Sequence, residues 1–211
     1  MIRKLGAIGD IHAEDSLLEQ SLQYLHSLVD EIVCVGDIVD GPGDTNRCCD
    51  LLKSHNVHVI SGNHERWMLN NEMRMLPGSN NKSQLRPELV DWLQQLPATK
   101  EIKTVGGKLL LCHGLGKNDM ALLRPDDQGY ALTSNMALEE ILYESKARYV
   151  VSGHTHQRMV RKIDSVTFVN AGTLVKQQNP CFCIIDFDTK IVQFFNLETG
   201  EIVPGEVQTL P

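Results

Sequence analysis

The sequence has no excess of basic residues, no paired-cysteine motif and no long uninterrupted apolar run. Its 27 acidic residues outnumber the 20 basic ones and leave a formal charge of -7, which argues against a broad electrostatic surface for nucleic acid. The six cysteines lie mostly within apolar stretches and form neither a CxxC pair nor a small disulfide framework. We therefore expect reduced cysteines in the core and a small substrate, with nucleic acid an unfavoured partner.

No apolar segment reaches the roughly twenty residues that a membrane-spanning helix requires, so no membrane partner is expected. The first residues lead directly into a predicted strand without a signal-peptide pattern, and we expect a cytoplasmic protein. The 211 residues contain no repeat, low-complexity tract or long linker, which predicts a single domain over residues 1–211. No feature of the sequence specifies an oligomeric state.

Apolar periodicity near the start of the chain predicts alternating strands and helices. The expected elements are strands over residues 5–8, 32–35 and 57–60 and helices over 17–29 and around 48–52. This βαβαβ order implies parallel strands joined by right-handed crossovers. Because the carboxyl ends of such strands lie side by side, Asp10, Asp37 and Asn63 are expected at one edge of the sheet.

The remainder of the chain predicts antiparallel strands and one irregular excursion. Gly106-Gly107 separates two apolar runs as a two-residue hairpin loop does. Further strands are expected over residues 101–105, 108–112, 149–151, 159–163, 166–169, 182–185 and 191–196, with helices around 89–96 and over 135–147. The turn residues around Pro77-Gly78 mark residues 66–98 as a lid or side excursion. The expected fold is α/β, an α+β sandwich of two mixed β-sheets packed face to face and flanked by helices.

Five short motifs place metal-ligand side chains directly after predicted strands. Each motif carries a glycine, so each is expected to end a buried strand in a sharp turn that exposes a ligand. The motifs are Gly9-Asp10-Ile11-His12, Gly36-Asp37-Ile38-Val39-Asp40, Gly62-Asn63-His64-Glu65, Cys112-His113-Gly114 and Gly153-His154-Thr155-His156. Five of the eight histidines lie within them. The others, His26, His55 and His58, are expected to be surface or structural residues.

The residue types in these motifs predict a site for two divalent metal ions. Asp37 follows a buried strand, where an unpaired carboxylate is costly unless a cation offsets its charge, and one carboxylate can bridge two ions. Asp10 and His12, two residues apart, point to the same side, and His154 and His156 repeat that spacing. The nitrogen and oxygen donors, without thiolates, favour manganese, with iron, zinc, nickel, cobalt or magnesium as alternatives. The expected metal ligands are Asp10, His12, Asp37, Asn63, His113, His154 and His156.

In this order and register the motifs resemble those of the calcineurin-like metallophosphoesterase family. The resemblance runs from about Gly9 to Thr173, where Asn170-Ala171-Gly172-Thr173 is similar to the family's closing Asn-Pro-Gly-Ser turn. It implies hydrolysis of phosphate esters by in-line attack of a hydroxide that bridges the metals. It also implies two ligand sets that share Asp37: Asp10, His12, Asp37 and His156 for one ion, and Asp37, Asn63, His113 and His154 for the other.

The family pattern also implies roles for residues that do not bind metal. His64 is expected to face the leaving group and donate a proton or stabilise charge there, with Asp40 as its orienting partner. Glu65 is expected to cap the following helix rather than assist Asp40. Residues 67–96 and 116–133 are expected to line the substrate pocket.

One departure from the pattern bears on the substrate. In protein phosphatases and dinucleoside-polyphosphate hydrolases of this superfamily an arginine follows the second motif, whereas this chain reads Asp40-Gly41-Pro42-Gly43. Positive charge would have to come from elsewhere, with Arg47, Arg66 and Lys117 as candidates. The Gly-Pro pair looks closer to small single-domain phosphodiesterases. We therefore favour a phosphodiesterase acting on a small phosphate ester, with a phosphomonoesterase or a protein or nucleotide phosphatase as the alternative.

Three other interpretations predict different sequences. In the first interpretation the motif residues are polar loop residues whose hydrogen bonds are satisfied by the backbone, and no metal binds. A single Asp-x-His motif would fit that interpretation, whereas five motifs after five predicted strands favour the metal site. A nuclease of this family predicts a basic capping domain, which the acidic composition does not supply. A scaffold that has lost its chemistry predicts eroded ligands, whereas every ligand position is filled and His64 is retained.

Overall fold

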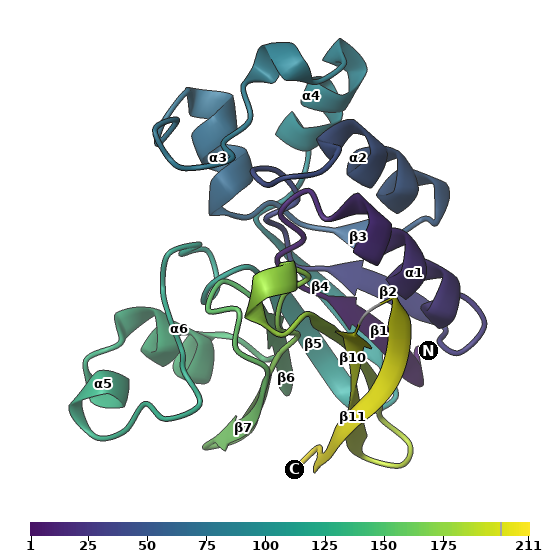
Figure 1. Cartoon of the computed structure of the whole chain (residues 1–211). Helices are drawn as coiled ribbons and strands as arrows, with labels where there is room; N and C mark the ends of the chain where they lie inside the picture. The colour runs from purple at the N-terminus through teal and green to yellow at the C-terminus, as the bar shows by residue number, and fades with distance from the viewer. Residues whose placement is uncertain (199) are drawn as a thin grey trace.

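The computed structural model of the chain describes residues 1–198 and 200–211. Two β-sheets pack against each other in the middle of the molecule, and helices cover the outer face of each sheet (Figure 1). The expected sandwich of two mixed sheets flanked by helices is confirmed. Among the described residues, every helix is too short or too polar to span a lipid bilayer.

The first sheet contains the alternating strands expected at the start of the chain. Its strands are β1 (Lys4–Ile8), β2 (Glu31–Cys34), β3 (His58–Val59), β9 (Cys181–Asp186), β10 (Ile191–Glu198) and β11 (Glu201–Thr209). They lie in the order β11-β10-β9-β1-β2-β3, with β1, β2 and β3 parallel and β9 antiparallel to β1. The helices α1 (Asp15–Leu25) and α2 (Thr45–Ser54) bury their apolar faces against this sheet.

The second sheet comes from the middle of the chain. Its strands are β4 (Thr99–Thr104), β5 (Gly107–Cys112), β6 (Tyr149–Ser152), β7 (Met159–Ile163) and β8 (Val166–Asn170), in the order β4-β5-β6-β8-β7. The strands β4 and β5 form the expected hairpin, and β5, β6 and β8 are parallel. The helix α6 (Met136–Glu144), preceded by the short helix α5 (Tyr130–Thr133), packs on the outer face through Leu138 and Ile141.

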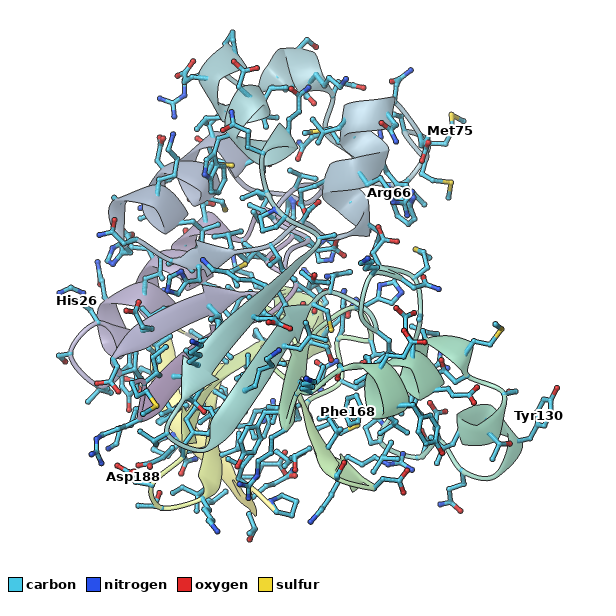
Figure 2. All side chains as sticks on the ribbon, turned by 180° about the vertical axis from the view of Figure 1, so that it is seen from behind. His26, Arg66, Met75, Tyr130, Phe168 and Asp188 are labelled. Carbon is cyan, nitrogen blue, oxygen red and sulfur yellow. The ribbon has the colours of Figure 1, made fainter. Side chains whose placement is uncertain are left out.

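Three apolar clusters fill the space between these layers. One lies between the two sheets and includes Leu5, Val33 and Val151. A second lies under α1 and α2, and a third lies under α6. Phe168 of β8 is fully buried in the third cluster, whereas Tyr130 projects from the surface beside it (Figure 2). The sheets are therefore fixed by apolar packing on both faces, which holds their strand ends at defined positions.

The excursion expected over residues 66–98 is largely helical. It contains the end of α3 (Asn63–Asn70), the 3₁₀ helix η1 (Lys82–Gln84) and α4 (Pro87–Gln94). Leu85, Leu89 and Leu93 are buried in the same cluster as the apolar faces of α1 and α2. The apolar residues of this excursion are therefore packed onto the core.

One expected helix boundary is wrong, and one strand was not expected, each for an identifiable reason. The helix predicted over residues 17–29 ends at Leu25, since the Asp30 carboxylate accepts the backbone N–H groups of Arg3 and Lys4, at 2.7 and 3.0 Å, and turns the chain into β2. The strand β11 was not expected, because Pro204-Gly205 is typical of a break. It pairs with β10 through a register shift, which the edge of a sheet tolerates.

Candidate metal centre

Strands from both sheets converge at one side of the sandwich. Since the parallel strands β1, β2 and β3 of one sheet end at a common edge, as do β5 and β6 of the other, and the two sheets pack face to face, residues far apart in the chain meet there. The structure brings all seven predicted ligands together at this edge. They are Asp10 and His12 after β1, Asp37 after β2, Asn63 after β3, His113 after β5, and His154 and His156 after β6.

The backbone at this edge is strained. Non-glycine residues seldom adopt positive φ angles, and where they do so the surrounding structure must hold them there. Most of the predicted site residues share this left-handed conformation: Asp10 (35°), His12 (46°), Asp37 (49°), Asp40 (66°), His154 (65°) and His156 (58°). Such strain is concentrated at functional sites in proteins, and here it turns each side chain inward from the end of its strand.

Two motif glycines allow the backbone to approach the carboxylates. A Cβ atom added to Gly62 would lie 2.2 Å from Asp37 Oδ1, and one added to Gly153 would lie 2.5 Å from Asp10 Oδ2. Both distances are far below a van der Waals contact. The glycines are therefore required by the packing of the backbone around the two carboxylates.

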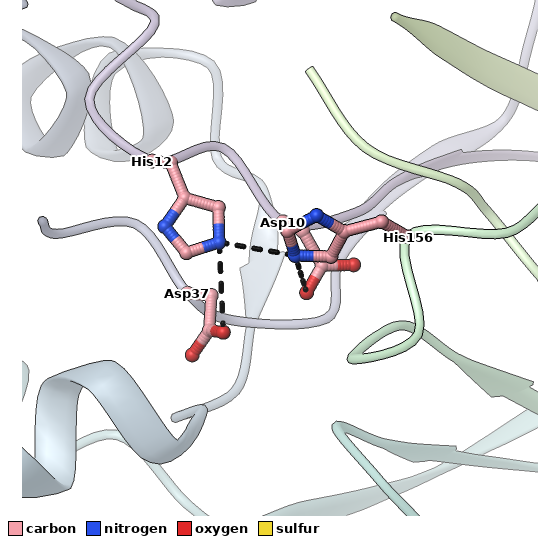
Figure 3. Close-up of side chains that lie close together, drawn as sticks. All are labelled: Asp10, His12, Asp37 and His156. Carbon is pink, nitrogen blue, oxygen red and sulfur yellow. Dashed lines mark hydrogen bonds and ion pairs between the residues drawn. The ribbon is translucent and has the colours of Figure 1, made fainter. Parts of the chain in front are cut away.

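The first donor group consists of Asp10, His12, Asp37 and His156, whose ligand atoms all lie within 4.8 Å of one another (Figure 3). The Nε2 atoms of His12 and His156 are 3.2 Å apart. His156 Nε2 lies 3.7 Å from Asp10 Oδ1, and His12 Nε2 lies 3.8 Å from Asp37 Oδ2. Two nitrogens and two oxygens thus point at one small volume.

The second donor group consists of Asp37, His113 and His154, again within 4.8 Å of one another. His113 Nε2 lies 3.2 Å from Asp37 Oδ2 and 2.8 Å from Asn63 Oδ1, which adds a neutral oxygen to the group. Asp37 belongs to both groups. The geometry is therefore that of two adjacent donor sets joined by one shared carboxylate.

Hydrogen bonds on the outer ring nitrogens orient three of the histidines. The Nδ1 atoms of His12 and His113 face the carbonyl oxygens of Asp40 and Val35, at 3.0 and 2.7 Å, and His156 Nδ1 faces Gln178 Oε1 at 2.5 Å. An Nδ1–H group that donates to an oxygen leaves Nε2 directed at the site. Imidazoles held in this way, together with two buried carboxylates, fit a pair of divalent cations.

The two carboxylates have opposite pKa shifts. Burial raises the pKa of Asp10 to about 6, against the opposing charges of His113 and His156. Burial also acts to raise the pKa of Asp37, but the positive charge and hydrogen bond of His113 outweigh it and hold that pKa well below its usual range. Asp37 therefore remains ionised throughout the neutral range, as a carboxylate shared by two cations must.

The imidazoles are also shifted in opposite directions. Burial lowers the pKa of His12 and His154 to about 4, so both are neutral and able to bind metal. Burial acts in the same direction on His113, but the charge of Asp37 outweighs it and raises the pKa of His113 to about 10. In the metal-free chain His113 thus supplies one positive charge beside Asp37, in a place where a cation would displace its proton.

A comparison with known protein families agrees with this arrangement. Residues 4–190 match the family model of the calcineurin-like phosphoesterase superfamily domain. The chain belongs to this superfamily. The family membership predicted from the motifs is confirmed, and so is the general expectation of phosphate-ester chemistry in the family.

Solved structures share this calcineurin-like fold. A metallophosphoesterase from Sphaerobacter thermophilus superposes with a TM-score of 0.72 at 18% identity, over 94% of this chain and 89% of that chain. An archaeal phosphodiesterase gives 0.58 at 16% identity, over 92% of this chain and 99% of that chain. Zinc-complexed Vps29 from Entamoeba histolytica gives 0.59 at 18% identity, over 99% of each chain. At sequence identities of 16–18%, these comparisons show a similarity of fold alone.

Beside the donor groups of this calcineurin-like phosphoesterase lies a chain of three paired side chains. His64 Nδ1 is 2.8 Å from Asp40 Oδ2, as the expected pairing requires. The guanidinium of Arg74 donates to both Asp40 oxygens, at 2.8 and 2.9 Å, and the backbone N–H of Asn80 donates to Oδ1 at 2.6 Å. Arg74 was not among the predicted residues, since it lies 34 positions beyond Asp40 with no motif to mark it.

Glu65 has a structural role that extends beyond helix capping. Its carboxylate accepts the backbone N–H of Gly62 at 2.8 Å, which confirms the expected cap at the start of α3. It also accepts the N–H groups of Asp37, Ile38 and Val39, at 2.9, 2.7 and 3.1 Å. Glu65 therefore fixes the loop that carries the shared carboxylate.

Two of the three candidate cations from the sequence are paired with carboxylates. Arg47 pairs with Asp15 and Glu19, at 2.6 Å each, and Arg66 pairs with Asp119 at 2.7 Å. Lys117 lines a groove against α6 together with Glu140 and Glu144. The charges of Arg47 and Arg66 are therefore already paired with carboxylates.

The remaining expectations concern cysteines and histidines outside the site. All six cysteines are buried and none forms a disulfide, as predicted. His26 and His55 contact each other at 6.0 Å between ring centroids, and His58 contacts Lys100 and Glu31. These three histidines make ordinary structural contacts.

Proposed function

We propose that this calcineurin-like phosphoesterase is a hydrolase that uses two divalent metal ions, manganese first among them, and prefers phosphodiesters. The observation that supports the proposal most directly is the position of Asp37, whose carboxylate belongs to both donor groups. In the proposal, one ion is held by Asp10, His12, Asp37 and His156, and the other by Asp37, Asn63, His113 and His154.

When bound, two such ions lower the pKa of a coordinated water and neutralise phosphoryl oxygens during in-line displacement. The residues of the chain must then supply a proton to the leaving oxygen. His64 Nε2 lies 3.9 Å from Asp37 Oδ2, so this nitrogen faces the donor groups while Asp40 holds the opposite nitrogen. In the proposed step the water oxygen bonds to phosphorus, the bond to the leaving oxygen breaks, and the His64 proton passes to that oxygen.

The surroundings of His64 favour its protonated form, which donation of a proton to the leaving oxygen requires. Burial acts to lower the pKa of His64, but the hydrogen bond to Asp40 and the charge of Asp37 outweigh burial and raise the pKa. The ring therefore retains its proton to higher pH than an ordinary histidine. A protonated ring close to the site of charge development is what a general acid needs.

A preference for diesters is supported by the pairing of three arginines, Arg47, Arg66 and Arg74, with carboxylates. Arg47 and Arg66 are paired with carboxylates, and Arg74 is engaged with Asp40. A phosphomonoester dianion carries more negative charge than a diester and gains more from a bidentate arginine contact. The archaeal structure of the same fold is, by its name, a phosphodiesterase, which supports the proposal by analogy.

The test is hydrolysis by protein stripped of metal and then loaded with Mn²⁺. The substrates are bis(4-nitrophenyl) phosphate and 4-nitrophenyl phosphate, with bound metal counted separately by elemental analysis. We expect metal-dependent turnover of the diester, abolished in Asp37→Asn. The matched control is Asp91→Asn, since Asp91 is an exposed residue of α4.

Faster turnover of the monoester would replace the phosphodiesterase with a phosphatase. Two bound ions per chain without turnover of either substrate would contradict the proposed catalysis. Full turnover by Asp37→Asn would contradict the assignment of the shared carboxylate.

A further inference from the structure

A groove opens directly beside the candidate metal centre at His156. Its volume is about 580 Å³, and its lining is mainly polar. Its lining includes the consecutive residues Thr155, His156, Gln157 and Arg158, together with Gln178 and Asn179. Neither His64 nor Asp40 lines this groove, so it lies away from the residues proposed to act on the leaving group.

The groove continues into a second one of about 700 Å³, because Arg158 and Asn179 line both. The second groove is also lined by Lys176, by Asn196 and by two acidic residues, Glu198 and Glu206. Arg158 therefore lies where the two grooves meet.

Arg158 is held firmly but is not neutralised. Its Nη1 donates to Asn196 Oδ1 at 2.7 Å and its Nη2 to the carbonyl oxygen of Asn179 at 3.3 Å, while the guanidinium lies 5.7 Å from the ring centre of Phe194. Within the described part of the chain, no carboxylate oxygen lies within 4.0 Å of it. Lys176, by contrast, pairs with the buried Glu14 at 3.2 Å.

The opposite wall of the groove is also fixed in place. Pro125 and Asp126 line it, and Arg161 of β7 donates to the carbonyl oxygens of Arg124 and Pro125 at 2.9 and 3.1 Å. The groove is therefore a built feature of the surface, formed by a loop that is tied to the second sheet.

On the basis of the proposed phosphoesterase function, we propose that Arg158 binds an anionic group on the arm of the substrate that is retained after hydrolysis. A guanidinium with neutral partners, fixed in orientation, is suited to a phosphate or carboxylate oxygen. Glu198 and Glu206 in the second groove repel further negative charge, so the anion is expected close to Arg158 and long polyanions are disfavoured. The substrate class is a small phosphodiester with one further anionic group close to the scissile phosphate.

Three matched diesters test this inference. Each has a 4-nitrophenyl leaving group, and the retained arm is ethyl, 2-phosphoethyl or 2-carboxyethyl. In each case the water oxygen bonds to the central phosphorus, the bond to the nitrophenyl oxygen breaks, the His64 proton passes to that oxygen, and the proton lost by the attacking water passes to solvent. We expect kcat/KM to be about tenfold higher with an anionic arm, mainly through KM, as for a hydrogen bond to a charged group.

In Arg158→Gln this preference should fall to a ratio near one. The control is Arg148→Gln, since Arg148 also has no carboxylate within 4.0 Å in the described residues but precedes β6, at the end opposite His154 and His156. It should keep the wild-type preference. A higher rate with the phosphate arm than with the carboxylate arm would identify phosphate as the group that Arg158 binds. Equal rates with the two arms would show that Arg158 accepts either small anion.

Binding measurements separate this inference from the proposed function. Calorimetry with unreactive methylphosphonate esters carrying the same three arms gives the arm preference without turnover. Tighter binding of the anionic arms that disappears in Arg158→Gln would support the subsite even if no diester is hydrolysed. Hydrolysis of all three diesters at equal kcat/KM, with equal binding of the three analogues, would overturn the subsite and leave the phosphodiesterase standing.

Discussion

At the scale of single residues, Asp40 shows how one buried charge is held in a functional position. Its side chain is 2% exposed and accepts hydrogen bonds from His64, Arg74 and the backbone of Asn80. The pKa of Asp40 lies below its usual range, because these hydrogen bonds outweigh the effect of burial. The orientation of the His64 ring therefore depends on Arg74, a residue that does not touch it.

The Arg74→Met substitution tests whether the orientation of His64 depends on Arg74 while metal binding is retained. The change leaves a buried carboxylate without its main partner, so we expect the free energy of unfolding to fall by about 3 kcal/mol. Diester turnover should fall at least about tenfold as His64 loses its fixed partner, with two metal ions still bound. The measurements are urea denaturation, kcat and elemental analysis.

Two further variants make this result interpretable. Arg86→Met removes an exposed pair with Asp50 and should change stability by less than about 1 kcal/mol. Arg74→Lys retains the charge but not the two parallel hydrogen bonds, and should restore only part of the turnover. If Arg74→Met retained the wild-type kcat, Asp40 would orient His64 without the hydrogen bonds from Arg74.

His64→Asn tests the proposed general acid through its pH dependence. The raised pKa of folded His64 predicts that wild-type turnover is full at pH values below it and falls as pH rises through it. The variant should lose about a hundredfold or more in kcat and should lack this alkaline decline. A variant with full turnover and the same pH profile would exclude the role, and His55→Asn serves as the control for a structural histidine.

At the scale of elements, the loop after β2 and the start of α3 are joined through Glu65. Glu65→Gln replaces an acceptor of four backbone hydrogen bonds with an amide whose NH₂ group must face a backbone N–H. We expect a loss of about 2–3 kcal/mol in unfolding free energy and weaker metal binding, because Asp37 moves with the loop. Glu88→Gln in the exposed first turn of α4 should have almost no effect, and equal losses in both variants would contradict the role of Glu65.

The elements predicted from the sequence are those with long apolar periodicity or a clear turn. The strands β1 and β2, the helix α1 and the hairpin around Gly106-Gly107 follow from local pattern, so they could be predicted. The short helix α3 was expected only as the helix that Glu65 caps, and its bounds could not be predicted, since it begins inside a motif and gains its stability from Glu65 and from packing of the excursion. The edge strand β11 depends on its partner β10 rather than on its own residues.

The candidate site, too, could be predicted from the sequence only in part. Motif spacing was sufficient to predict which seven side chains meet, because each follows a strand and the topology supplies the rest. It could not indicate Arg74, Gln178 or Arg158, since their contacts depend on loops packed from elsewhere in the chain. It also left Arg47 and Arg66 open as site cations, until their carboxylate partners were visible.

At the scale of the whole molecule, the donor groups join the two sheets. Asp10 and Asp37 belong to the first sheet, whereas His113, His154 and His156 follow strands of the second. Bound ions should therefore stabilise the sandwich as well as the site. At a metal concentration a hundred times the Kd, each ion adds about 2.7 kcal/mol, or roughly 5–10 °C in the unfolding midpoint of a chain of this size.

Chelation removes both ions and should therefore lower the unfolding midpoint of wild-type protein by roughly 10–20 °C in calorimetry, and Mn²⁺ should restore it. Asp37→Asn, without the shared carboxylate, should respond little to either treatment. Equal midpoints for loaded and stripped wild-type protein would contradict the role of the ions in joining the sheets.

The six buried thiols allow the opening of each layer to be timed. Cys34, Cys181 and Cys183 belong to the first sheet, Cys48 and Cys49 to α2, and Cys112 to the second sheet. Burial raises the pKa of every one of these thiols, so an alkylating reagent can react only while a layer is transiently open. The cysteines of the wild-type chain thus report on each layer separately. Mass spectrometry of the labelled peptides would reveal whether the helices leave the sheets before the sheets separate.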